Sequence, residues 1–233
     1  MKLLAFDTST EILRVAVQAG DPARGGVFEH EAEGGPRASA TLIPVILDLM
    51  ARADLQLRDL DAIVFGRGPG SFTGLRTACS VAQGLAFGAD IPVLPVDTLL
   101  AVAEDARHRH GAESVVALLD ARMDEVYSAG YAYEGGSWRQ AAGSSLGRPE
   151  DVTVPAGWVL AGNGFSVYGT RLPAAARMEA APTASALLRL APVLLAAGQA
   201  VPAAHAMPLY IRDKVAQTTE ERAVARATPA VQP

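Results

Sequence analysis

The chain has 233 residues, half of them hydrophobic, and a formal net charge of −5 at pH 7. This length allows one large domain or two lobes, and this apolar fraction allows a full hydrophobic core. The acidic balance argues against a surface that binds nucleic acid unaided, because neutralising phosphates needs a basic surface.

The first half of the sequence alternates between strand and helix patterns. Alternating apolar and polar residues predict a three-stranded meander over residues 2–6, 12–18 and 27–33. The elements predicted next are a helix over 39–53, a strand over 62–65, a helix over 71–87, a strand over 91–96 and a helix over 98–110. This order predicts an α/β lobe of the actin-like superfold, which includes sugar kinases and Hsp70.

The predicted helix over residues 39–53 carries an apolar stripe. The stripe lies on one face of the helix and consists of Ile43, Ile46, Leu47 and Met50.

The second half begins in the same way but is shorter. Strands are predicted over 114–119, 125–133, 137–142 and 157–161, and a helix over 183–197. We therefore predict an N-terminal, partner-binding lobe over 1–105 and an abbreviated C-terminal lobe over 106–217. Residues 218–233 are polar, Ala-rich and end in proline, which predicts a disordered tail.

A glycine-rich stretch, GRGPGSFTGLR over residues 66–76, joins a predicted strand to a predicted helix. Gly66, Gly68 and Gly70 permit unusual backbone dihedrals, and Ser71 suits a helix N-cap. The spacing matches neither the GxxxxGK[ST] phosphate loop nor the GxGxxG dinucleotide fingerprint. The residue pattern alone therefore leaves the ligand open.

Four stretches in order resemble the signature of the TsaB (YeaZ) family, the bacterial partners of TsaD in tRNA threonylcarbamoyladenosine synthesis. They are LAFDTST over 4–10, the glycine-rich stretch with AQGLA over 82–86, DARMDEVY over 120–127 and PLYIR over 208–212. Their order and spacing fit over roughly residues 1–216, nearly the whole chain.

The resemblance implies a non-catalytic subunit that binds and supports TsaD while a threonylcarbamoyl group is transferred to the adenosine next to the anticodon. It further implies that the complex recruits TsaE, that ATP and metal belong to the partners, and that tRNA is contacted only through the complex. This chain would then have no cofactor of its own, and it would pair with TsaD or with a second copy of itself.

TsaD-like catalytic proteins carry a metal-binding motif, HMEGH, after the strand that corresponds to residues 91–96. The residues at that position here, 97–102, read DTLLAV, so the two metal-binding histidines are missing. His108 and His110 are two residues apart on a predicted helix and point about 200° apart. The two imidazoles are therefore poorly placed to bind the same metal ion. We therefore expect neither a metal site nor a catalytic residue in this chain.

Two turns are candidate nucleotide or interface contacts. Asp7 ends the first predicted strand, where the actin-like superfold holds a phosphate loop, but the sequence also fits an ordinary Asx or Ser turn. The tripeptide Gly162–Asn163–Gly164 follows a strand where an adenosine loop occurs in this superfold, and it also fits a tight turn.

Arg122 and Asp124 lie at the tip of a predicted hairpin. The two open interpretations are a solvated turn and, from the resemblance, a face near the partner's nucleotide site.

The helix after the glycine-rich stretch carries a row of small residues. Gly74, Ala78, Ala82 and Ala86 recur every four residues and form one ridge, with Phe72 and Leu75 beside it. Such a ridge packs closely either on the protein's own sheet or on a partner helix. The resemblance favours the partner, so these six residues are the predicted partner-binding residues.

Two rival functions remain open at this stage. An ATP-dependent small-molecule kinase of the same superfold would need ATP contacts at Asp7 and at 162–164, and a glycoprotease-like peptidase would need the missing metal motif. The single cysteine, Cys79, excludes an internal disulfide and fits a reducing cytosol. With no secretory signal and no membrane-spanning run visible, we expect a cytoplasmic protein without a membrane partner.

Overall fold

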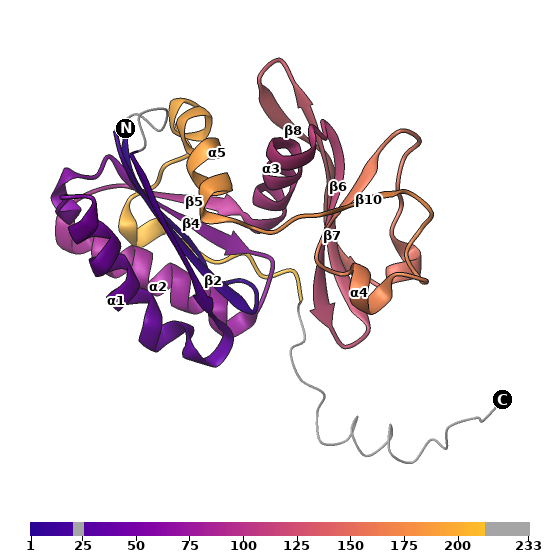
Figure 1. Ribbon diagram of the computed structural model, residues 1–233, viewed down its shortest axis with the longest axis horizontal. Coiled ribbons are helices and arrows are strands. Elements are labelled where there is room, and N and C mark those ends of the chain that lie inside the picture. The colour runs from indigo at the N-terminus through magenta and orange to yellow at the C-terminus, as the bar shows by residue number, and fades with distance from the viewer. Residues whose placement is uncertain (21–25, 213–233) are drawn as a thin grey trace, which may run out of the picture.

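The computed structural model describes residues 1–20 and 26–212 and contains two five-stranded sheets (Figure 1). The stretch predicted to be a disordered tail, 218–233, lies outside the described residues. Over the described part of the chain, no helix combines the length and the hydrophobicity needed to cross a membrane.

The first sheet has the strand order β3-β2-β1-β4-β5. Its strands are β1 (Lys2–Asp7), β2 (Ile12–Ala19), β3 (Val27–Glu33), β4 (Ala62–Gly68) and β5 (Val93–Asp97). The first three form the predicted antiparallel meander, and β1, β4 and β5 are parallel. Helices α1 (Ala38–Arg52) and α2 (Phe72–Ala89) cover one face and bury a core that includes Phe6, Leu42 and Phe65.

The second sheet repeats this topology with the order β10-β9-β6-β7-β8. Its strands are β6 (Ser114–Arg122), β7 (Glu125–Glu134), β8 (Ser137–Gly147), β9 (Val159–Gly162) and β10 (Ala176–Glu179). Again three antiparallel strands precede two parallel ones. Where the first lobe has the 18-residue α2, the second has only the four-residue α4 (Phe165–Tyr168). The predicted actin-like architecture with an abbreviated second lobe is confirmed.

Two helices lie between the sheets (Figure 1). Helix α3 (Thr98–His110) packs mainly on the second sheet, where Val102 and Ala106 join its core. Helix α5 (Ala184–Ala196) packs on the first sheet through Leu187 and Ala191. Each lobe is thus covered in part by a helix that follows the last strand of the other lobe.

The predicted boundary at residue 105 assigns residues 106–217 to the second lobe. In the structure, α5 and the C-terminal segment return to the first sheet instead. Val201 pairs with Val93 at the edge of β5, and Ala203 and Ala206 are buried in the first-lobe core. An apolar helix face packs on whichever complementary sheet face is free. Position in the sequence alone therefore does not decide to which lobe a helix belongs.

Candidate functional site

A cleft of about 290 Å³ lies between the two lobes. It is formed by the loop after β1, the N-terminus of α2, the turn between β6 and β7, and the C-terminal segment. The residues that line the cleft include Thr10, Glu11, Phe72, Leu75, Asp120, Arg122, Met123, Asn163, Tyr210 and Arg212.

The glycines of the GRGPGSFTGLR stretch allow close contact with the protein's own backbone. A Cβ on Gly74 would lie 1.8 Å from the carbonyl oxygen of Thr8, and the Thr8 hydroxyl donates to the carbonyl oxygen of Gly74 at 2.7 Å. Gly68 has a φ of +123°, and a Cβ there would lie 2.5 Å from the carbonyl oxygen of Leu209. These glycines therefore join the β1 loop, α2 and the C-terminal segment.

Asp7 is fully buried and does not line the cleft. Its Oδ1 accepts hydrogen bonds from the Ser9 amide at 2.9 Å and the Ser9 hydroxyl at 2.6 Å. Its Oδ2 has no hydrogen-bond partner among the described residues and faces Gly66. Burial raises the pKa of the Asp7 carboxyl, and the Ser9 hydrogen bonds and the charge of Arg14 offset only part of this rise. The structure thus places Asp7 in an Asx-type turn beneath the glycine-rich stretch.

Arg122 and Asp124, the two charged candidates at the turn between β6 and β7, point to different partners. Arg122, Met123 and Asp124 all have positive φ, at 60°, 54° and 64°. The Arg122 guanidinium lies in the cleft and pairs with Glu11 of the first lobe at 2.5 Å. Asp124 is not among the cleft-lining residues and pairs with Arg171, whose guanidinium holds the pKa of the Asp124 carboxyl below its usual range. Only Arg122 therefore belongs to the cleft.

The Gly162–Asn163–Gly164 tripeptide packs tightly on β6. A Cβ on Gly162 would lie 1.7 Å from the carbonyl oxygen of Leu118, and one on Gly164 would lie 2.5 Å from the Leu118 side chain. Asn163 lines the cleft, but its Oδ1 accepts a hydrogen bond from the Asp120 amide at 3.1 Å. The glycines thus serve the turn, and Asn163 is the member of the tripeptide that reaches the cleft.

The predicted partner-binding residues divide into three groups. Gly74 packs against the carbonyl oxygen of Thr8 in the loop after β1. Phe72 and Leu75 line the cleft. Ala78, Ala82 and Ala86 are buried in the core of the first lobe. The small-residue row was predicted to be an association surface, and the structure places it against the chain's own sheet instead. The small side chains let α2 lie close to that sheet. The ridge is thus buried within the first lobe and is not exposed to a partner helix.

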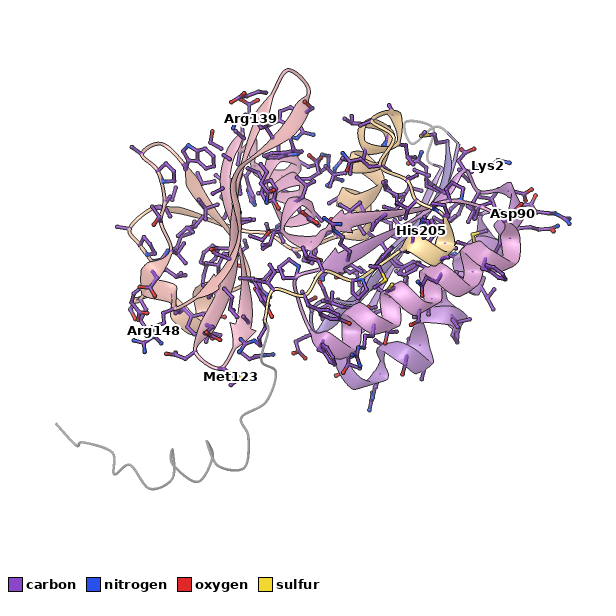
Figure 2. All side chains as sticks on the ribbon, turned by 180° about the vertical axis from the view of Figure 1, so that it is seen from behind. Lys2, Asp90, Met123, Arg139, Arg148 and His205 are labelled. Carbon is purple, nitrogen blue, oxygen red and sulfur yellow. The ribbon has the colours of Figure 1, made fainter. Side chains whose placement is uncertain are left out.

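A different part of α1 and α2 is exposed and apolar. The two helices lie side by side on the outer side of the first lobe (Figure 2). On α1, Ile46 and Met50 are buried, whereas Ile43 is exposed and Leu47 is 54% exposed. On α2, Phe87 is 81% exposed. On α1, the exposed and the buried residues both belong to the apolar stripe that the sequence predicts on one face.

The residues that replace the HMEGH metal motif have structural roles. Asp97 pairs with Arg67 at 2.5 Å, and the Thr98 hydroxyl accepts a hydrogen bond from the Gly68 amide at 3.1 Å. Within residues 1–20 and 26–212, no cluster of three or more His, Cys, Asp or Glu side chains could hold a metal ion.

The repeated lobes, with a glycine-rich turn of the first lobe lining the cleft, are the features of an actin-like protein. A family model places this protein in the TsaD class. The family model described as "TsaD: tRNA N6-adenosine threonylcarbamoyltransferase" matches residues 19–227.

Relatives narrow this class further. The tRNA threonylcarbamoyladenosine biosynthesis protein TsaB of Escherichia coli K12 is 35% identical, over 93% of this chain and 96% of that protein. The Haemophilus influenzae protein of the same name is 36% identical, over 92% of this chain and 95% of its own length. A solved structure described as YeaZ from Pseudomonas aeruginosa is 41% identical with a TM-score of 0.82, and the match covers 90% of this chain and 99% of that chain. The chain therefore belongs to the TsaB (YeaZ) family.

Proposed function

We propose that this protein is a non-catalytic subunit in tRNA threonylcarbamoyladenosine biosynthesis, acting in the cytosol. It binds a TsaD protein through its first lobe and supports threonylcarbamoyl transfer to the adenosine next to the anticodon. Membership of the TsaB family supports this role, since its relatives carry that biosynthetic name over nearly their whole length.

The observation that carries the docking proposal is the exposed apolar surface on α1 and α2. Leu47 and Phe87 are large hydrophobic side chains that remain mostly in contact with solvent, at 54% and 81% exposure. Large apolar side chains left exposed on two neighbouring helices are a feature of surfaces where another protein binds. A TsaD protein is the occupant that we propose, since the TsaD family model matches this chain. A second copy of this chain is the alternative occupant, and the experiment below separates the two.

The geometry of the cleft supports a role without chemistry of its own. Asp7 is sealed beneath Gly66, and the cleft residues Arg122 and Asn163 already have partners within the chain. We therefore assign ATP, metal and the transferred group to TsaD and TsaE. The net charge of −5 supports tRNA contact through the complex and not through this chain alone.

The docking proposal is tested by measuring affinity for TsaD from the same organism. Leu47→Asp and Phe87→Asp each place a charge on the exposed apolar surface. Val167→Asp is the matched control, because Val167 is also 59% exposed but lies on α4 of the second lobe.

We expect Leu47→Asp and Phe87→Asp to weaken TsaD binding by about tenfold or more, because charge is excluded from the desolvated centre of an interface. Thermal melting should be unchanged in all three variants, and Val167→Asp should bind normally. Normal TsaD binding by both first-lobe variants would overturn the docking proposal. Loss of self-association with normal TsaD binding would assign the surface to a homodimer.

A further inference from the structure

The C-terminal segment crosses from the first lobe to the second beside the cleft. Figure 2 shows it running from His205 on the first lobe towards Met123 on the second. On the first lobe, the Leu209 amide donates to the Arg67 carbonyl oxygen at 2.7 Å. The Tyr210 ring packs on Phe72 at a centroid distance of 5.2 Å. The segment is therefore firmly held on the first lobe up to Tyr210.

The next two residues are held by the second lobe. Ile211 packs against the hydrophobic core beneath the second sheet. The Arg212 guanidinium pairs with Glu125 at 2.8 Å and donates to the Ala121 carbonyl oxygen at 3.0 Å and the Met123 sulfur at 3.3 Å. We call Ile211 and Arg212, with these contacts, the latch.

A second link crosses the cleft but is weaker. Glu11 and Arg122 form an ion pair between the lobes, and both side chains are mostly exposed. Exposed ion pairs contribute little to stability, because water screens them and both side chains lose conformational freedom. The latch therefore carries most of the attachment between the lobes at the cleft.

The lobes are joined far more deeply on the other side, at α3. The buried Glu104 carboxylate accepts hydrogen bonds from Arg189 of α5 and Trp138 of β8, both at 2.9 Å. The buried Asp105 carboxylate accepts one from the Ala181 amide at 3.1 Å, on the segment that returns to the first lobe. We call Glu104 and Asp105, with these contacts, the α3 pivot.

Breaking the α3 pivot costs more free energy than breaking the latch, because the charged groups that lose their partners are buried to different extents. Without Glu104, the Arg189 guanidinium would lose its carboxylate in a mostly buried environment, which is costly. Without Arg212, the Glu125 carboxylate is 32% exposed and can be solvated by water. Separation of the lobes is therefore easier at the cleft than at α3.

We propose that the latch holds the interlobe cleft closed and that its release lets the two lobes open by rotation about the α3 pivot. Hinge motion of two lobes about a few fixed contacts is a common form of conformational change. The proposal depends on the contacts described here and not on the function of the complex.

The test measures distances between spin labels in the full-length chain, in a Cys79→Ser background that removes the native thiol. One label pair, Thr73→Cys with Arg148→Cys, spans the cleft from exposed positions on the two lobes. A second pair, Ala196→Cys with Arg139→Cys, spans the pivot side, where the end of α5 faces the β8 hairpin (Figure 1). Both pairs are measured in Arg212→Ala and in Arg37→Ala, a control that removes an exposed arginine of the first lobe.

We expect Arg212→Ala to shift the cleft pair to longer distances with a broader distribution, while the pivot pair and the Arg37→Ala control stay as in the parent protein. Glu125→Gln removes the ion pair but keeps Arg212, so it should shift the cleft pair in the same direction. An unchanged cleft pair in folded Arg212→Ala would overturn the latch. Equal lengthening of both pairs would overturn the pivot. If Arg212→Ala does not fold, an unchanged cleft pair in Glu125→Gln overturns the proposal.

Discussion

Gly66 lies directly on the buried carboxyl group of Asp7. A Cβ placed on Gly66 would be 1.8 Å from Asp7 Oδ2, closer than any real contact of this kind. The end of β4 can therefore close over β1 only because residue 66 has no side chain. This contact also separates Asp7 from the cleft that its neighbours Ser9 and Thr10 line.

We expect Gly66→Ala to destabilise the protein by about 3 kcal/mol or more, because the added methyl group forces β4 away from Asp7. The matched control is Gly84→Ala on α2, where a Cβ meets nothing within 4 Å. This control should be neutral or stabilise the protein by about 0.5–1 kcal/mol, since alanine favours a helix. Urea denaturation measures both, and equal stability of the two variants would contradict the close contact.

Asp7 should make stability fall as the pH rises. Burial raises the pKa of the folded-state carboxyl above its ordinary value of 3.8, so the folded protein keeps a proton that the unfolded chain releases. The stabilisation is fully present below 3.8 and is lost as the pH rises through the raised pKa. Asp7→Asn is neutral at every pH, so its stability relative to the parent protein should improve between pH 4 and pH 7. A stability difference that stays constant over this range would mean that Asp7 is ionised in the folded state.

Strongly patterned elements of the fold could be predicted from the sequence. The alternation in residues 12–18 and the apolar strand over 62–65 predict β2 and β4, and the repeated order predicts the two lobes. The short elements α4 and β10, with four residues each, were missed because so short a segment carries no periodicity. The return of α5 to the first sheet was missed because it depends on which sheet face is free.

The site was harder to predict than the fold. The ridge of Gly74, Ala78, Ala82 and Ala86 was correctly identified as a close-packing surface, but spacing alone cannot say what packs on it. The exposure of Leu47 depends on how α1 lies on the first sheet, which the spacing of apolar residues along the helix does not give. The contacts of Arg212 join residues nearly ninety positions apart, such as Glu125. No local pattern encodes them.

Ala82→Glu should unfold or strongly destabilise the protein, because Ala82 is fully buried in the first-lobe core. A carboxylate there would be buried without a partner, which costs several kcal/mol. Ser80→Glu, at an exposed position of the same helix, is the control and should melt like the parent protein. Circular dichroism melting separates the two. A folded Ala82→Glu variant that has lost only its partner would return the ridge to the role of an association surface.

Glu104→Ala should cost about 3–5 kcal/mol, because it leaves Arg107 and Arg189 without their shared carboxylate. Burial alone would raise the pKa of Glu104, but hydrogen bonds from Arg107, Trp138 and Arg189 outweigh it, and the net shift is downward. The carboxylate is therefore charged at neutral pH. Glu134→Ala removes an exposed ion pair with Arg139 and should change stability by less than about 0.5 kcal/mol. Similar midpoints for both variants in a denaturant titration would contradict the central role of Glu104.

The most direct test of the proposed non-catalytic role is a reconstituted tRNA modification reaction. It contains TsaD, TsaE, the threonylcarbamoyl-adenylate synthase, threonine, bicarbonate, ATP and tRNA, with this protein added or omitted. Omission should abolish the formation of threonylcarbamoyladenosine. Arg122→Ala and Asn163→Ala each alter one cleft side chain on a second-lobe turn, and they should lower the rate only as far as they lower complex formation. A variant that assembles fully but loses about a thousandfold in rate, about 4 kcal/mol of transition-state stabilisation, would contradict the account.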